Sequence, residues 1–496
     1  MSSPQPAFRL PDKQLVLDKK DASAEKEFKY SEITRCLCAA AYMDSNFRHQ
    51  VIKQCIEEKH KAIGPCIGMD LVTVARHCLI AERKLNKRDL LLCALMVFGL
   101  IVAAAADPGP AMAIWILIVP VTFGLCLWQD LRIRSIVSKN FRQGTFDPNS
   151  LFGAEERDFS SLADSQNGNA VIYSGFSPFV GSGVDLNGWS FALNSNKGSE
   201  VLEVRHEPKP FEINELYEHV EQDIKQLQLQ RVSIEDRIYV NGQDIRNDRR
   251  FLETPLSKPR VSVDPQILKS AVEQSSQQVR HYRCIRIVDW SGELVLSIFL
   301  RFSKLSHNLF VEANYFVLGP LYERYRAVDS IPAHLSLKKW LELLVKSAVA
   351  SPFLLILSPF IILGRLLQGV ARWSERRQER KNILENPAFD YGAGFSIRQW
   401  TSSGFYRRYF QKLDKEMYLK TLEKNILDSI VTFLEQRNID VSEVKQRQTT
   451  ILNSGVMMTG GSINAESLAV GEKAKSVASR VTDAASKALT TAAGKR

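Results

Sequence analysis

The sequence predicts an α+β membrane protein with a helical N-terminal module, a two-helix transmembrane hairpin, a cytoplasmic α+β domain with an antiparallel sheet, a re-entrant or interfacial apolar helix and a helical C-terminal region. Three observations lead to this prediction. Residues 90–106 and 111–128 are uncharged apolar runs that a short turn separates. Residues 282–318 contain three consecutive runs with the composition of strands. A third apolar segment, residues 341–363, has basic residues on both sides.

The predicted hairpin occupies residues 89–128, with Asp107-Pro108-Gly109-Pro110 as its turn. Helices of about 17–25 apolar residues cross a bilayer, and each run lies near the lower end of that range. A helix satisfies its own backbone hydrogen bonds, so both runs can cross. The basic residues that flank the hairpin are Lys84, Lys87, Arg88, Arg132, Arg134 and Lys139. Because the turn carries only Asp107, the positive-inside rule predicts both flanks in the cytoplasm.

The third apolar segment, residues 341–363, contains Lys346 and two Ser-Pro-Phe steps. A basic cluster follows it, formed by Arg372, Arg376, Arg377, Arg380 and Lys381. A full span would place this cluster outside, against the positive-inside rule. A broken helix that re-enters the membrane or lies along its surface keeps both flanks cytoplasmic, and we favour it. A third span and a buried core helix remain alternatives. We expect the basic cluster to contact anionic lipid, although a topology anchor explains it equally.

Composition limits the class of protein. The 496 residues are 45% hydrophobic and 24% charged, so most of the chain lies in water and a channel or transporter is disfavoured. The net charge of +10 favours an anionic partner, with lipid head groups first.

Residues 1–29 lack the apolar core of a cleavable signal peptide. The cysteines of residues 36–78 and their neighbouring histidines suggest zinc, but we expect core cysteines and no metal, because Cys36-x-Cys38 lies in an alanine-rich helix.

Composition and turn signals also divide the chain into segments. These are a flexible arm (1–30), a helical module (31–88), the hairpin (89–128), a linker (129–165), a cytoplasmic α+β domain (166–330), a membrane-associated apolar segment with its basic helix (331–385), a helical region (386–445) and a Gly/Ala/Ser/Lys-rich tail (446–496). In the α+β domain we expect strands at 171–173, 189–193, 237–240, 282–290, 293–302 and 308–318, and helices at 211–230 and 265–278. Ser291-Gly292 predicts a hairpin turn, and the alternation in 293–302 predicts a half-buried strand.

Two stretches are candidates for binding. The loop from Gly175 to Gly183 includes Gly181 and Ser182, and its backbone amides are suited to an anion or another ligand. It lacks the Lys-Ser/Thr of a P-loop, and a tight turn explains its glycines as well. Residues 405–410 mix aromatic and basic side chains, as in proteins that stack single-stranded bases, but an amphipathic helix is the more common explanation. We therefore rank nucleic-acid binding through Arg407 and Arg408 as a third and weaker hypothesis.

The residues give no specific sign of catalysis. The sequence contains neither a Gly-x-Ser-x-Gly elbow nor a His-Glu-x-x-His motif. We assign no catalytic residue and no cofactor. Binding partners are therefore expected to be the bilayer, with its anionic lipids, and a protein partner or further copies of this chain. Whether the chain is an enzyme stays open, with the balance against it.

Several phrases resemble an uncharacterised family of bacterial multi-pass membrane proteins. They are residues 39–44 (AAAYMD), 173–183 (YSGFSPFVGSG), 239–246 (YVNGQDIR) and 451–455 (ILNSG). The resemblance implies the bacterial inner membrane and supplies no mechanism. We expect a membrane-anchored sensor, scaffold or effector, including a defence or stress effector that oligomerises and perturbs the membrane. The alternative is a membrane-surface enzyme with a ligand site near the Gly175–Gly183 loop.

Overall fold

The computed structural model describes residues 32–105, 107–148, 159–201, 204–273, 276–332 and 335–454. The expected arm at 1–30, part of the expected linker and most of the expected tail lie outside these residues. The chain forms two units, Met1–Lys445 and Gln446–Arg496. Of the second unit the structure describes only the end of α12 (Ser442–Ser454). All further description concerns the first unit.

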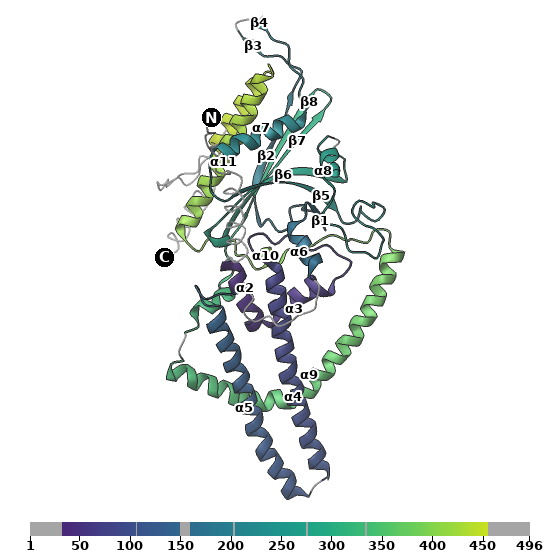
Figure 1. Ribbon diagram of the computed structural model, residues 1–496, viewed down its shortest axis with the longest axis vertical. Coiled ribbons are helices and arrows are strands. Elements are labelled where there is room, and N and C mark those ends of the chain that lie inside the picture. The colour runs from purple at the N-terminus through teal and green to yellow at the C-terminus, as the bar shows by residue number, and fades with distance from the viewer. Residues whose placement is uncertain are drawn as a thin grey trace, which may run out of the picture. The chain divides into compact units, whose positions relative to one another are not determined.

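A six-stranded sheet forms the centre of the first unit (Figure 1). Its strands are β1 (Ala170–Tyr173), β2 (Val184–Asn194), β5 (Val232–Asn241), β6 (Val279–Asp289), β7 (Leu294–Leu305) and β8 (Asn308–Leu318). They lie in the order β1-β5-β6-β7-β8-β2. A separate ribbon pairs β3 (Glu200–Val201) with β4 (Val204–Arg205). The predicted strands are all present, and β6 and β7 join through Trp290–Gly292 as the Ser291-Gly292 turn predicted.

The sheet is mixed, so the prediction of an antiparallel sheet was wrong in one pair. β1 runs parallel to β5, with Ala170 opposite Ile238. The chain leaves β1, forms β2 at the far edge of the sheet, and returns through α7 (Ile213–Gln226) to β5. A connection of this length lets β5 enter beside β1 in the same direction, as parallel pairing requires. An alternating sequence pattern identifies a strand, but it does not show whether that strand runs parallel or antiparallel to its neighbour.

The prediction of a half-buried β7 was also wrong, because this strand is buried on both faces. Along β7, every residue from Leu294 to Leu300 is buried. On one face α7 packs against the strand, where the Phe302 amide donates to the Tyr217 hydroxyl at 2.9 Å. On the other face Phe179 stacks on Phe299, with ring centroids 4.3 Å apart. Central strands that are covered on both sides lose the alternation that an open face preserves.

The helical module has a core that it shares with the C-terminal half of the chain. It consists of α2 (Glu32–Met43), α3 (Ser45–Ile52), the π-helical turn Lys53–Glu57 and the start of α4 (Leu71–Ala105). Buried with these are Tyr325, Val328 and Ile397, which belong to the 3-10 helix η3 (Glu323–Ser330) and to α10 (Ile397–Trp400). Cys36, Cys38, Cys55, Cys66 and Cys78 are buried free thiols in this module. The module therefore does not form a core by itself.

The hairpin helices extend beyond the predicted boundaries. α4 is one helix from Leu71 to Ala105, and α5 runs from Pro108 to Asn140. The end of α5 occupies the first part of the stretch that we interpreted as a linker, because Val137 and the following Phe141 are buried in the core of the helical module. Both helices are long and apolar enough to cross a membrane, and so is α9 (Leu337–Glu385).

α9 is an uninterrupted helix of 49 residues, whereas the sequence predicted a broken one. Pro352 and Pro359 each remove one backbone donor from it. The carbonyl groups left without that donor belong to Ala348 and Leu355, four residues earlier. Each accepts instead from the serine before the proline, at 3.3 Å from Ser351 Oγ and 2.7 Å from Ser358 Oγ. In each Ser-Pro step the serine hydroxyl therefore replaces the amide donor that the proline lacks. As a result α9 bends but remains one helix (Figure 1).

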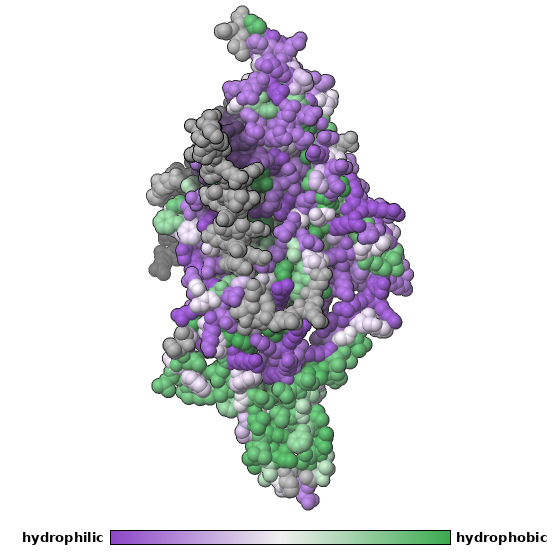
Figure 2. Space-filling model, in the orientation of Figure 1, coloured by the Kyte–Doolittle hydropathy of each residue, from purple (hydrophilic) through white to green (hydrophobic). Residues whose placement is uncertain are grey.

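Apolar surface is concentrated on the hairpin and the adjoining part of α9 (Figure 2). The sheet and the helices around it, α7, α8 (Pro265–Glu273) and α11 (Tyr409–Gln436), present mainly polar residues in the same view. An apolar area of this extent is unusual on a soluble protein.

Candidate functional site at the base of the hairpin

Three ion pairs tie α9 to the hairpin and to the helical module. In the first, Arg365 lies 2.5 Å from Asp89 of α4, whose side chain is only 4% exposed. Arg88 contacts the other oxygen of the same carboxylate at 2.7 Å. In the second, Lys346 lies 3.8 Å from Asp130 of α5. The third pair joins Arg372 to Glu57 at 2.5 Å.

The two carboxylates of the hairpin lie near the same end of it. At about 1.5 Å per helical residue, Asp89 is about 27 Å and Asp130 about 35 Å from the turn at Asp107. Lys346 precedes and Arg365 follows the two prolines of α9, and both residues reach this end, the base of the hairpin. The apolar middle of α9 therefore starts and finishes at the base.

Small residues let the three helices approach closely. The buried side chains of the apolar part of α9 are Ser347, Ser351, Leu355 and Ser358. Gly99 of α4 faces α5, where a Cβ atom would stand 2.8 Å from Ile118 Cδ1 and 3.0 Å from the Trp115 ring. Small residues at helix interfaces are typical of membrane-embedded packing, because backbones can then come into contact.

The remaining faces of α9 are apolar and exposed. They carry Leu341, Val345, Val349, Phe353, Ile356, Leu357, Phe360, Leu363, Leu366, Leu367, Val370 and Trp373. The apolar surface continues two turns beyond Arg365 and ends where the basic cluster begins. A helix in water would have polar residues at these positions.

The predicted basic cluster lies along the end of α9 and does not converge on one point. Arg376, Arg377, Arg380 and Lys381 are exposed, whereas Arg372 is partly buried by its pair with Glu57. The Arg377 guanidinium lies 3.8 Å from the centre of the Trp373 ring. Lys381 pairs with Glu385 at 3.8 Å. These side chains form a charged stripe beside the apolar surface.

The glycine loop packs closely against neighbouring backbone. Gly181 has φ +86°, and a Cβ atom there would stand 2.3 Å from the Pro65 carbonyl oxygen. Gly183 likewise faces the Val317 carbonyl oxygen at 2.2 Å, while Gly175 has φ +81° and open space around it. The Gly181 amide donates to Gln399 at 2.8 Å, and Ser182 is buried. Close approach and positive φ explain Gly181 and Gly183 without a ligand.

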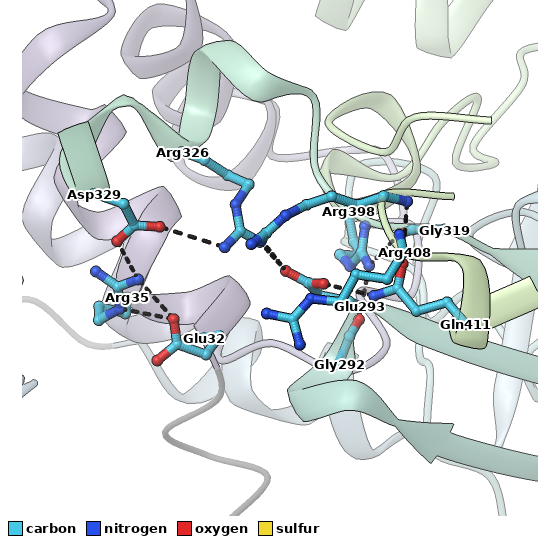
Figure 3. Close-up of polar contacts among 11 residues, drawn as sticks. Glu32, Arg35, Gly292, Glu293, Gly319, Arg326, Asp329, Arg398, Arg408 and Gln411 are labelled. Carbon is cyan, nitrogen blue, oxygen red and sulfur yellow. Dashed lines mark hydrogen bonds and ion pairs between the residues drawn. The ribbon is translucent and has the colours of Figure 1, made fainter. Parts of the chain in front are cut away.

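A buried ionic network joins the module to the sheet and to α11 (Figure 3). Glu293, at the start of β7, has a side chain only 7% exposed. It accepts from Gln411 of α11 at 2.7 Å and pairs with Arg407 and Arg326. The network continues from Arg326 through Asp329, Arg35 and Glu32, where the ion-pair distances are 3.3, 2.7 and 2.6 Å.

Arg398 supports the same junction through backbone carbonyl groups (Figure 3). It is fully buried, and its Nη2 donates to the carbonyl oxygens of Gly292 at 2.8 Å and Gly319 at 2.7 Å. Burial lowers the pKa of this guanidinium to about 10. The β6–β7 turn is therefore held from two sides by arginine.

Sequence analysis did not identify Asp89, Arg365 or Glu293 as site residues. Asp89 had a signal, because an ionisable residue at the edge of an apolar span is rare and seeks a partner. Glu293 was interpreted as a polar residue on an open strand face. Arg365 had no distinguishing signal, because the distant part of the chain that it contacts cannot be read from its neighbours.

These features define an α+β protein with three helices long and apolar enough to cross a membrane. Residues 188–464 match the AbeC-like domain family, which is more than half of the chain, so this protein belongs to that family. The matched region contains most of the sheet, α9 and α11, whereas the hairpin precedes it. No curated protein and no solved structure matches the chain.

Proposed function

We propose that this protein is a sensor or effector anchored in the bacterial inner membrane, in which the state of a cytoplasmic AbeC-like domain is passed to the membrane hairpin. One observation carries the proposal: α4 is a single helix from the helical module to the turn of the hairpin. At its start Val74, Ala75 and Cys78 are buried in the core that the module shares with the C-terminal half. A continuous helix moves as a unit, so a shift in that core displaces the hairpin.

The contacts of α9 support a re-entrant or interfacial position for it. Lys346 and Arg365 lie on either side of Pro352 and Pro359, and both pair with carboxylates at the base. A third span would carry Arg365 to the opposite end of the hairpin from Lys346. With both ends at the base, the basic cluster stays on the side of the hairpin flanks, which agrees with the positive-inside rule.

Labelling of single cysteines tests this topology. The native background is suitable because seven of the eight native cysteines are buried and Cys93 lies within the hairpin. Burial also raises the pKa of Cys36 to about 11, which suppresses its reactive thiolate. In spheroplasts, a membrane-impermeant maleimide should label Asp107→Cys at the exposed turn. It should label Ser374→Cys, at an exposed position in the basic cluster, only after lysis. Labelling of Ser374→Cys in intact spheroplasts would instead establish α9 as a third span.

The effector form of the proposal rests on the exposed apolar surface of α9, which lies beside the hairpin and is available to lipid or to a second copy of the chain. Expression of the protein in a bacterial host should lower the membrane potential, measured with a potential-sensitive dye. Arg365→Gln should weaken the effect, because it removes one of the three ion pairs that hold α9 against the hairpin and the helical module. Lys412→Gln, an exposed change of the same charge on α11, is the matched control. An unchanged potential with correctly inserted protein would reject the effector form and leave the sensor form.

The charged stripe provides the proposed contact with anionic lipid. Arg376, Arg377 and Arg380 are exposed beside apolar surface, and each such charge contributes about 1 kcal/mol of attraction to an anionic leaflet. A fluorophore on Ser374→Cys should be quenched more by head-group spin labels in anionic nanodiscs than in zwitterionic ones. Replacing the three arginines by glutamine should remove the difference; equal quenching before replacement would reject the contact.

A further inference from the structure

A cleft of about 580 Å³ lies between the sheet and the helical module, away from the hairpin. One wall is formed by β5 and β6, which contribute Ser233, Glu235, Arg237, Arg286 and Val288. The other is formed by the loop before α4, the start of α4, and α6 (Ser160–Asn167). The arginine wall belongs to the AbeC-like domain, and the opposite wall precedes the matched region.

Two buried arginines on the sheet wall share one carboxylate oxygen. Glu235 Oε2 accepts from Arg237 at 2.8 and 3.0 Å and from Arg286 Nη1 at 3.4 Å. The side chains of Arg237 and Arg286 are 9% and 7% exposed, whereas that of Glu235 is 44% exposed. Desolvation opposes the charge on Glu235, but the two guanidinium groups outweigh it and hold the pKa of Glu235 below its usual value. One carboxylate therefore serves two cations.

Arg286 has a buried donor that no described residue satisfies. Its Nε is buried without a hydrogen-bond partner among the residues that the structure describes. A buried N–H of a charged group without an acceptor costs more than about 1–3 kcal/mol, so it calls for an explanation, and a bound water, ion or ligand is one. Arg398 and Arg365 also have buried donors without a partner among the described residues. Arg286 lines the cleft, but its Nε is buried, so an acceptor in the cleft reaches Nε only when the Arg286 side chain turns toward it.

Among the described residues that line the cleft, the other charged side chains are Arg76 and Asp70. Arg76 lines the opposite wall, with its guanidinium carbon 5.1 Å from the centre of the Phe159 ring. The other acidic residue, Asp70, caps α4: its two oxygens accept from the Thr73 amide at 3.1 Å and the Thr73 hydroxyl at 2.7 Å. The positive N-terminal end of the helix offsets that carboxylate. The described lining of the cleft thus has three arginines and two carboxylates.

We propose that this cleft binds a phosphate-bearing small molecule of nucleotide size, with the phosphate held by Arg237 and Arg286. Planar guanidinium groups bind phosphate oxygens in pairs, and this favours phosphate over a point-like anion. The volume is within the range of about 300–1,000 Å³ typical of small-molecule sites, so it has room for more than a phosphate. Ile67, Val72 and Val288 supply apolar surface for the organic part.

This inference deepens the sensor proposal and rests on it, because the cleft is lined by the first turns of α4. The lining of the cleft includes Asp70, which precedes α4, and three residues of its first turns, Val72, Thr73 and Arg76. The helix α4 then continues to the membrane hairpin. A ligand that draws Arg286 and the start of α4 toward one phosphate changes the position of α4. The ligand would thus be the signal that the hairpin receives.

The test uses the full chain in lipid nanodiscs and isothermal titration calorimetry at constant ionic strength. The probes are inorganic phosphate, the four ribonucleoside monophosphates and the corresponding nucleosides. At least one monophosphate should bind about tenfold or more tightly than its nucleoside, as expected for a charge-assisted contact. Equal affinity of nucleotide and nucleoside, or no heat with any probe, would overturn the proposal.

Two cleft variants with opposite expected effects on the affinity for the monophosphate distinguish a ligand site from a purely structural role. Arg286→Gln should weaken binding of the monophosphate about tenfold or more, and Glu235→Gln should strengthen it, because the competing carboxylate is removed. Arg280→Gln is the matched control, since Arg280 is exposed on the same strand and does not line the cleft. Binding unchanged in both cleft variants would overturn the site. If Arg286→Gln does not fold, the direction in which Glu235→Gln changes the affinity still tests the proposal. A negative result with the expected cysteine labelling would reject the ligand and leave the membrane-anchored function standing.

Discussion

The guanidinium of Arg365 lies 2.5 Å from the carboxylate of Asp89, although the two residues are 276 positions apart in the chain. The pair joins α9, which belongs to the AbeC-like domain, to α4, which precedes it. Arg88 contacts the second oxygen of the same carboxylate. The buried carboxylate of Asp89 is therefore one of the contacts that connect the hairpin to the family domain, together with the Lys346–Asp130 pair.

We expect Asp89→Ala to weaken the attachment of α9 to the hairpin. Removing one partner of a buried pair leaves the other charge uncompensated, which costs up to about 3–5 kcal/mol, and less here because Arg365 is 32% exposed. The melting temperature in detergent should fall, and α9 should become sensitive to protease. Asp107→Ala at the exposed turn is the control and should have no effect. Equal melting temperatures for the two variants would contradict the role of this pair.

We expect Ser358→Ala to destabilise α9 although the change is small. Ser358 Oγ is the donor to the Leu355 carbonyl, which Pro359 leaves without its helical partner. An unsatisfied carbonyl in an apolar setting costs about 1–3 kcal/mol. Ser374→Ala, an exposed serine on the same helix, should be neutral. Hydrogen exchange of α9 in nanodiscs measures the effect, and unchanged protection around Leu355 would disprove it.

Gly99 should be the least replaceable glycine of the hairpin. In Gly99→Val the new side chain meets Trp115 and Ile118, so α4 and α5 must move apart; overpacking of this kind costs about 1–3 kcal/mol. Gly124 of α5 has nothing within 4 Å of a Cβ atom, and Gly124→Val is the matched control. Thermal stability measured by fluorescence-detected size-exclusion chromatography should fall only for Gly99→Val. A comparable loss in both variants would mean that the hairpin tolerates no added bulk anywhere.

Glu293→Gln should loosen the junction between the sheet and α11. The variant keeps the shape of the side chain but removes the charge that Arg326 and Arg407 share. Breaking one member of a buried ionic network costs about 3–5 kcal/mol when the remaining charges stay buried. Glu385→Gln changes only an exposed pair with Lys381 and should cost close to nothing. Urea unfolding followed by tryptophan fluorescence should show a lower midpoint for Glu293→Gln alone.

Asp236 should make the stability of the sheet depend on acid. Desolvation opposes its charge, but hydrogen bonds from His281 and Arg283 outweigh that effect and hold the pKa of Asp236 well below its usual value. A carboxyl whose pKa is lower in the folded state stabilises the fold above its unfolded pKa of about 3.9, and the contribution disappears as the pH falls below it. Stability should thus drop between about pH 5 and pH 2. Asp236→Asn should show a shallower pH dependence, and an identical slope would exclude this cause.

The sequence was sufficient for features that depend on local composition. Uncharged runs around Asp107 predicted the hairpin, and alternating and β-branched runs predicted the strands on both sides of Ser291-Gly292. Hydrophobic length and turn chemistry act over a few residues, so neighbouring residues carry the information. The approximate starts of α7 and α8 followed for the same reason, but α7 ends at Gln226 and α8 at Glu273, several residues before the predicted ends. α5 extended further than predicted because a distant core covers its last turns.

The candidate sites depended on contacts between distant segments. The Asp89–Arg365 pair, the sharing of Glu235 by Arg237 and Arg286, and the burial of Glu293 each require segments that lie far apart in the chain. A charged residue has the same local pattern whether it ends in solvent or in a buried pair, because burial is decided by what packs over it. The sequence by itself determined that helices and strands form and which helices are apolar. Only the tertiary structure decided the direction of β1 beside β5, the burial of β7 on both faces and the return of α9 to the base of the hairpin, since each of these follows from packing between segments that local composition does not encode.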